Sequence, residues 1–126
     1  MELTHTRLLV KNYKECYEFY REVLKFPCTW GDDSTNYAQF TVGATQLAIF
    51  EKQQMLEDIG ESLPDLEQNM FQAMLIFRVA NVDQKYEELK SRVHFINEPH
   101  DRIDWGIRVV HFKDPEGNLI EMNHNI

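Results

Sequence analysis

Apolar residues recur with helical spacing in two stretches of the chain. In the first stretch they are Cys16, Phe19, Tyr20, Val23 and Leu24, and in the second Val82, Tyr86, Leu89 and Val93. Each stretch follows an asparagine that has Glu or Gln three residues later, which favours a helix start capped by the asparagine side chain. Asn81 lies 69 positions after Asn12, and the residues around the two asparagines are similar. The pattern therefore predicts a repeat with one helix in each copy.

Strand-like segments with alternating apolar and polar residues flank each predicted helix. They cover residues 4–10, about 27–31, 36–42 and 45–50 in the first copy, and 71–79, about 93–97, 105–112 and 118–123 in the second. The order predicts an α+β fold of two tandem βαβββ modules. Module one spans about 1–52 and module two about 71–126 of a single domain. The crossover at about 53–70 contains a short helix around Met55–Ile59, and Pro64 interrupts its continuation.

Composition narrows the classes of partner. The 126 residues carry a formal charge of −8 without a basic cluster, so a nucleic-acid partner is not expected. No apolar run is long enough to cross a membrane, and the start of the chain lacks a signal-peptide pattern, so we expect a soluble, cytoplasmic protein with no membrane partner. Cys16 and Cys28 form no C-x-x-C motif or disulfide framework and are expected to be buried free thiols.

The segment Asp114–Met122 joins a turn to a strand that carries a carboxylate among apolar residues. Pro115 and Gly117 suit the second and fourth positions of a type I turn. In the strand that follows, Glu121 shares a face with Leu119 and Asn123, whereas Ile120 and Met122 point to the other side. Glu121 therefore needs a partner, a cavity or solvent.

The ending Asp114–Glu121, the run Trp105–Arg108 and the start His5–Val10 resemble the vicinal oxygen chelate superfamily. That superfamily includes glyoxalases, bleomycin- and fosfomycin-resistance proteins and ring-cleaving dioxygenases. The resemblance implies two modules that form a curved mixed-sheet cleft with helices on the outer face. It also implies a divalent metal held by residues on the first and last strand of each module.

The four metal positions implied by the resemblance are only half filled. His5 and Glu121 stand at the first and last of them, but the other two fall on Met74 and Ala48, which are not ligands for such an ion. A two-residue shift in two strands would instead bring Gln46 and Gln72 to these positions. We therefore expect no metal cofactor, with a divalent metal bound by His5 and Glu121 as the alternative.

The expected ligand-binding cleft includes further residues of these strands. Its residues are His5, Arg7, Gln46, Ala48, Phe50, Gln72, Met74, Trp105 and Glu121. Arg7 could pair with an anionic group of a ligand or with Glu121 itself. Aromatic residues, namely Trp30, Tyr37, Phe50 and Trp105, could form an apolar wall or belong to the core. The remaining histidines are expected to be structural or solvated: His94, His100, His111 and His124.

The sequence therefore predicts a glyoxalase/bleomycin-resistance-like protein that binds a small organic ligand and has an incomplete metal site. The alternative is a divalent-metal-dependent lyase, isomerase or dioxygenase of the same superfamily, and a regulatory or assembly module with a vestigial cleft is a third class. Whether the chain is an enzyme is left open. The resemblance also suggests a homodimer.

Overall fold

The computed structural model describes residues 4–58 and 74–126 of the chain. The chain divides into two compact units, unit 1 from Met1 to Gln68 and unit 2 from Asn69 to Ile126. No helix in the described ranges is both long enough and apolar enough to cross a membrane.

Unit 1 contains one four-stranded mixed sheet with helices. Its elements are β1 (His5–Val10), α1 (Tyr13–Glu18), the π-helical turn η1 (Phe19–Val23), β2 (Cys28–Trp30), β3 (Tyr37–Val42), β4 (Thr45–Glu51) and α2 (Lys52–Asp58). The strand order is β1-β4-β3-β2, with β1 parallel to β4 and the other pairs antiparallel. This is a βαβββ arrangement followed by a short helix, as the sequence predicts.

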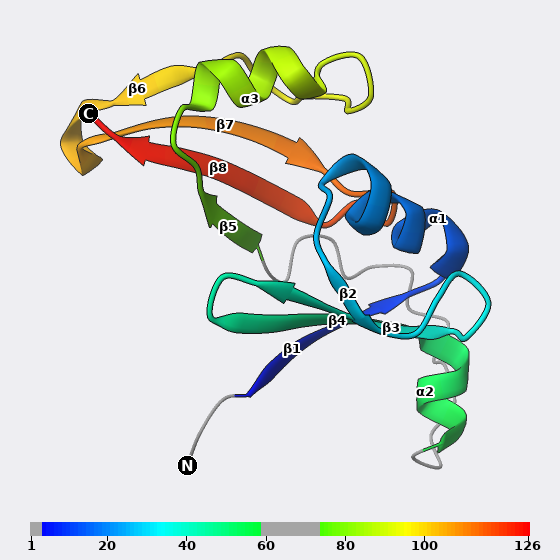
Figure 1. The fold of residues 1–126 in the computed structure, drawn as a ribbon. Helices are drawn as coiled ribbons and strands as arrows, with labels where there is room; N and C mark the ends of the chain where they lie inside the picture. Colours follow the sequence, from blue (N-terminus) through cyan, green and yellow to red (C-terminus); the bar gives the residue numbers. More distant parts are fainter. Residues whose placement is uncertain (1–3, 59–73) are drawn as a thin grey trace. The chain divides into compact units, whose positions relative to one another are not determined.

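Unit 2 repeats the arrangement (Figure 1). Its elements are β5 (Met74–Arg78), α3 (Val82–Leu89), β6 (His100–Arg102), the 3-10 turn η2 (Ile103–Trp105), β7 (Ile107–Lys113) and β8 (Leu119–Asn125). The order β5-β8-β7-β6, with β5 parallel to β8, matches that of unit 1. The predicted α+β fold with two βαβββ modules is therefore confirmed.

Each sheet buries one face beneath its helix. In unit 1 the aromatic rings of Tyr17 and Tyr20 lie 6.0 and 6.1 Å from that of Phe40, so α1 and η1 cover the Phe40 side of the sheet. In unit 2, α3 lies along the sheet beside β7 and β8 (Figure 1). Alternation along the strands then places the other set of side chains on the opposite face of each sheet.

The two helix starts differ in their caps. The Asn81 side chain accepts a hydrogen bond from the backbone N–H of Gln84 at 3.0 Å, so the predicted cap of α3 is confirmed. The start of α1 has no side-chain cap hydrogen bond, so the same prediction for Asn12 is wrong. Asn81 has an extended backbone that suits a cap, whereas Asn12 does not.

The strand predicted at about 93–97 is misplaced. Phe95 makes only an isolated bridge to Phe112, and the paired strand β6 begins at His100. The Phe95 ring lies between those of Tyr86 and Phe112, at 4.7 and 5.3 Å, and so holds this loop against the core. Here the side chain of Asn97 accepts a hydrogen bond from the His111 N–H. In a regular strand pair a backbone carbonyl would accept this hydrogen bond.

The predicted turn before the last strand is well defined. Gly117 N–H donates to the Asp114 carbonyl at 2.9 Å, and the buried Asp114 carboxylate accepts from the N–H groups of Glu116 and Asn118. Gly117 has a φ of +84°, a value that favours glycine. This turn fixes the register of β7 and β8, in which His111 lies opposite Glu121.

Candidate functional site

A row of three side chains crosses the second sheet on the side away from α3. The strand register places Ile76 of β5, Glu121 of β8 and His111 of β7 next to one another. The neighbouring row contains Asn123, paired with Arg78 on one side and Val109 on the other. We call this side of the sheet the Glu121 face. Its residues on these three strands are Met74, Ile76, Arg78, Ile107, Val109, His111, Lys113, Leu119, Glu121, Asn123 and Asn125.

Two donors hold the carboxylate of Glu121 on this face. Nε2 of His111 lies 2.9 Å from Oε2, and Nδ2 of Asn123 donates to Oε1 at 2.9 Å. Glu121 is only 6% exposed and Asn123 only 7%. A carboxylate removed from water is strongly unfavourable unless donors or charges compensate it, so these contacts let Glu121 occupy a buried position.

A side chain outside the sheet orients His111. Oδ1 of Asn97 accepts the backbone N–H of His111 at 2.9 Å, while Nδ2 of Asn97 lies 2.9 Å from Nδ1 of the same histidine. An amide NH₂ group can only donate, so Nδ1 is the acceptor. The neutral imidazole then carries its proton on Nε2 and donates it to Glu121. Asn97, His111, Glu121 and Asn123 form a continuous chain, which we call the polar cluster.

The polar cluster ends in an acceptor that is not satisfied. Oδ1 of Asn123 is buried and has no hydrogen-bond partner among the residues described. The amide cannot be reversed without placing an oxygen against the Glu121 carboxylate, because Nδ2 makes that contact. A buried carbonyl oxygen without a donor costs about 1–3 kcal/mol, and such a group in a native structure calls for an explanation.

Unit 1 presents aromatic side chains on the equivalent side of its sheet. The guanidinium of Arg7 lies 5.0 Å from the ring centre of Tyr37 and 5.7 Å from that of Phe50. The Tyr37 ring also meets Phe50 and Trp30 edge to face, each at 5.4 Å. These cation–π contacts hold the Arg7 guanidinium against the aromatic rings of the sheet. Three of the predicted aromatic wall residues therefore gather in unit 1.

The predicted cleft residues of unit 1 share this side of the sheet. His5, Arg7 and Leu9 pair with Gln46, Ala48 and Phe50 along β1 and β4. His5 is exposed, and its Nδ1 lies 2.9 Å from the hydroxyl of Thr4. Gln46 bonds to Thr41 and Gln39, as expected of a hydrogen-bonding residue. Ala48 lies between Arg7 and Gln39, as Glu121 lies between Ile76 and His111 in unit 2.

The other predicted cleft residues lie in unit 2 or outside the described ranges. Met74 begins β5 beside Leu119 and is 41% exposed. Trp105 lies in η2, outside the sheet, where the guanidinium of Arg102 lies 4.1 Å from its ring centre. Gln72 falls outside the residues that the structure describes, as do Ile59 and Pro64.

Arg108 has a structural position on the helix side of the second sheet. It donates two hydrogen bonds to Asp83 in the first turn of α3 and a third to Asp101, at 2.7–2.9 Å. These contacts hold the pKa of the Asp83 carboxyl below its ordinary value. His124 is also structural, because its Nδ1 accepts the N–H of Val82 at the start of α3.

His111 is predicted to be structural or solvated like the other histidines, yet it is the hydrogen-bond partner of Glu121. The turn carries the missing signal. Residues 111 and 121 are each five positions from Glu116, the middle of the five residues that join β7 to β8, so a regular hairpin pairs them. A prediction from this symmetry would have found the pair without any knowledge of the family.

The donor set of the described residues does not suit a divalent metal. No group of three or more His, Cys, Asp and Glu side chains in residues 4–58 and 74–126 is arranged to hold one. Metal-binding histidines offer a lone pair on one nitrogen and donate the other N–H to an acceptor. His111 has the reverse arrangement, because its Nδ1 faces the donor of Asn97 and its Nε2 faces Glu121.

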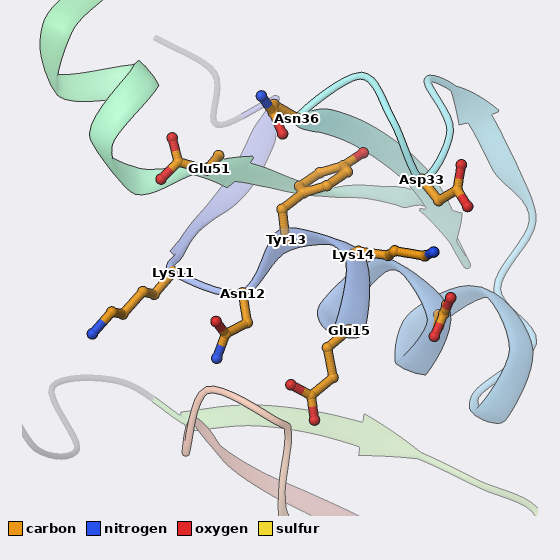
Figure 2. Close-up of a pocket in the computed structure, with 9 residues that line it drawn as sticks. Lys11, Asn12, Tyr13, Lys14, Glu15, Asp33, Asn36 and Glu51 are labelled. Carbon is orange, nitrogen blue, oxygen red and sulfur yellow. The ribbon is translucent and has the colours of Figure 1, made fainter.

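A separate depression lies at the start of α1 in unit 1 (Figure 2). It has a volume of about 520 Å³ and is widely open to solvent. Polar and charged side chains line it, including Lys11, Glu15, Asp33 and Glu51. We therefore assign it no binding role, since small-molecule sites are enclosed and largely apolar.

Tyr13 at this depression gives a testable pH dependence. Burial raises the pKa of its phenol to about 12, and its hydroxyl donates to the Asp32 carbonyl at 2.6 Å. Because the folded pKa is raised, this contribution to stability is present below pH 10 and lost as the pH rises toward 12. In urea denaturation at a series of pH values, Tyr13→Phe should lose less stability than the wild type across that range, by on the order of 1 kcal/mol after solvent screening. Equal losses in both proteins would contradict the prediction.

Comparison with known proteins identifies the fold family. Residues 2–122 match the model of the Glyoxalase/Bleomycin resistance protein/Dioxygenase superfamily. The chain is 40% identical to the uncharacterized protein YraH of Bacillus subtilis (strain 168), over 97% of each chain. A glyoxalase/bleomycin resistance protein/dioxygenase from Nocardioides is 22% identical, with a TM-score of 0.84 over 100% of this chain and 84% of that one. Lactoylglutathione lyase from Agrobacterium tumefaciens is 18% identical, with a TM-score of 0.74 over 97% and 92%. The chain thus belongs to the Glyoxalase/Bleomycin resistance protein/Dioxygenase superfamily.

Proposed function

We propose that this chain is a small-molecule-binding member of its superfamily and that the polar cluster of unit 2 anchors the ligand. The unsatisfied Oδ1 of Asn123 carries the proposal, because a ligand hydroxyl, amine or amide N–H would supply the missing donor. The buried carboxylate of Glu121 lies next to it and is held by neutral donors. The ligand therefore carries at least one hydrogen-bond donor, on the group that binds next to Oδ1 of Asn123.

The apolar neighbours of the cluster suit the remainder of such a ligand. Ile76 is paired with Glu121 and is 61% exposed, and Met74 precedes it on the same face. Apolar side chains around a few polar anchors are typical of small-molecule sites. Arg7 and the aromatic rings of unit 1 form a second surface with the chemistry to hold a planar organic group, and we propose it as a separate contact region.

Binding without a resident metal accounts best for the donor set. Ala48 and Met74 lack groups that coordinate a divalent ion. The hydrogen bonds of His111 place a proton on Nε2, where a metal-binding nitrogen would need a lone pair. The alternative function, a divalent-metal-dependent lyase, isomerase or dioxygenase, would need His5 and Glu121 as ligands. Titration of the purified protein with nickel, zinc, manganese and ferrous iron separates the two. Stoichiometric binding that is lost in both His5→Ala and Glu121→Ala would favour the enzyme.

A screen of small aromatic alcohols, amines and carboxamides tests the binding site itself. Ligand binding should raise the unfolding temperature, because a compound specific for the folded state stabilises it. For each compound found, Asn123→Ala should weaken binding by at least about tenfold, which corresponds to the loss of one buried hydrogen bond.

Asn125→Ala is the matched control for that experiment. Asn125 lies two residues further along β8 on the same face, but it is exposed and accepts from Arg78. It should leave binding nearly unchanged. Equal weakening by both variants, or the absence of any stabilising compound, would contradict the proposed site. The homodimer suggested by the family resemblance stays a prediction that sedimentation velocity can test.

A further inference from the structure

We propose that Asn97 is a positioning residue that closes the polar cluster to divalent cations by fixing the tautomer of His111. The inference rests on the proposed function in one respect, namely that this cluster works without a metal. It adds the residue responsible and a substitution that should reverse the property. Asn97 contacts only His111 in the polar cluster, through two hydrogen bonds of 2.9 Å, so it acts through that histidine.

The orientation of the Asn97 amide is determined by the backbone. The N–H of His111 requires an acceptor, and Oδ1 of Asn97 provides it. The NH₂ group must then face Nδ1 of the ring. Reversing the amide would turn the NH₂ group toward the His111 N–H and lose that hydrogen bond, leaving two donors opposed. The backbone N–H of His111 therefore determines the tautomer of the His111 ring, because it sets the orientation of the Asn97 amide that contacts Nδ1.

This tautomer is incompatible with metal binding through Nε2. A histidine binds a divalent ion through an unprotonated nitrogen, so the neutral ring would have to move its proton to Nδ1. There the proton would point at the NH₂ group of Asn97. Two oxygens could complete a metal site. Oε2 of Glu121 lies next to Nε2 of His111, and Oδ1 of Asn123 lies within the same cluster. The amide of Asn97 thus decides between two states of the cluster. With asparagine, His111 shares a proton with Glu121, and without this amide the same residues would form part of a metal site.

His100 provides the opposite case within the same unit. Its Nδ1 lies 2.9 Å from the backbone carbonyl of Glu98, which can only accept. Its neutral ring must therefore carry the proton on Nδ1 and have the lone pair on Nε2. The rings of His100 and His111 lie 6.1 Å apart, yet their hydrogen bonds select different tautomers.

Nitrogen-15 NMR of the wild-type imidazole rings tests the tautomer directly. Long-range proton–nitrogen correlations at a pH where the rings are neutral should show His111 protonated on Nε2 and His100 protonated on Nδ1. The two histidines serve as internal references for each other. A His111 ring protonated on Nδ1 would overturn the proposal regardless of how any variant behaves.

Asn97→Asp should convert the cluster into a metal site. One carboxylate oxygen keeps the hydrogen bond from the His111 N–H, and the other accepts a hydrogen bond from a protonated Nδ1. A metal ion can then displace the proton from Nε2, because the ring keeps one proton on Nδ1. A carboxylate behind a ligating histidine changes metal affinity by about 10–100-fold. We expect Co²⁺ and Zn²⁺ to bind Asn97→Asp at least tenfold more tightly than the wild type, with a cobalt visible spectrum that indicates a nitrogen ligand.

Asn125→Asp and Asn97→Asp/His111→Ala are the controls. Asn125→Asp adds the same charge to the Glu121 face without a contact to His111, so it should not gain affinity, and the double variant should lose the gain. Wild-type binding as tight as that of Asn97→Asp would overturn the proposal, as would an equal gain in Asn125→Asp. These results are independent of the compound screen, so failure of this inference is distinguishable from failure of the proposed function.

Discussion

Phe112→Ala should destabilise unit 2 by about 3–5 kcal/mol, the usual range when a large buried aromatic side chain is truncated. Phe112 is fully buried on β7, on the helix side of the second sheet. Its ring meets Phe95, which in turn meets Tyr86 of α3, so three segments share one aromatic cluster. Removal of the Phe112 ring leaves a cavity beneath Phe95 that α3 and the Phe95 loop cannot both fill, because each is tied to the sheet by other contacts.

Urea denaturation followed by circular dichroism measures this loss. Phe112→Leu keeps much of the volume and should cost less than half as much, whereas Ile103→Ala should have little effect because Ile103 is 72% exposed. A loss below about 1 kcal/mol for Phe112→Ala would contradict the packing described, since it lies far under the range for buried aromatic residues.

The fold could be predicted because its signals are local. Helical spacing of Val82, Tyr86 and Leu89 and the sequence of the turn at Asp114–Gly117 are properties of short segments, and the repeat doubles each of them. The prediction of a strand at about 93–97 failed because side chains, and not a ladder of backbone hydrogen bonds, hold this segment against the sheet. Around Phe95 the aromatic packing and the Asn97 side chain hold the loop, and neither effect has a signature in hydrophobic alternation.

The candidate site was harder to predict because its residues come from three separate segments. Glu121 stood out as a charge on an apolar strand, but its partners depend on the pairing of β7 with β8 and on the path of the Asn97 loop. The pairing of His111 with Glu121 could be predicted from the turn between β7 and β8. The contact of Asn97 with His111 could not be predicted, because it depends on the conformation of an irregular segment. The family's metal positions point to His5 and carry no information on His111, which lies on a strand that supplies none of them.

His111→Leu should destabilise the protein by about 2–4 kcal/mol, because it leaves the Glu121 carboxylate buried without its main donor. His111 is partly exposed, at 19% for its side chain, so we place the expected loss below the top of the range for fully buried pairs. Leucine has a similar volume, and the loss therefore reports the polar contact more than a cavity.

A double-mutant cycle with Glu121→Leu separates the pair from its surroundings. Because the His111–Glu121 hydrogen bond is the main interaction, the variant that lacks both groups should be more stable than the sum of the two single losses predicts, by at least about 1 kcal/mol. It could even recover most of the wild-type stability, since apolar replacement of a buried pair is often neutral or stabilising. Additive losses would show that His111 and Glu121 act independently. Strong coupling would instead show that each side chain needs the other in its buried position. A double variant as stable as the wild type would show that the pair adds little net stability.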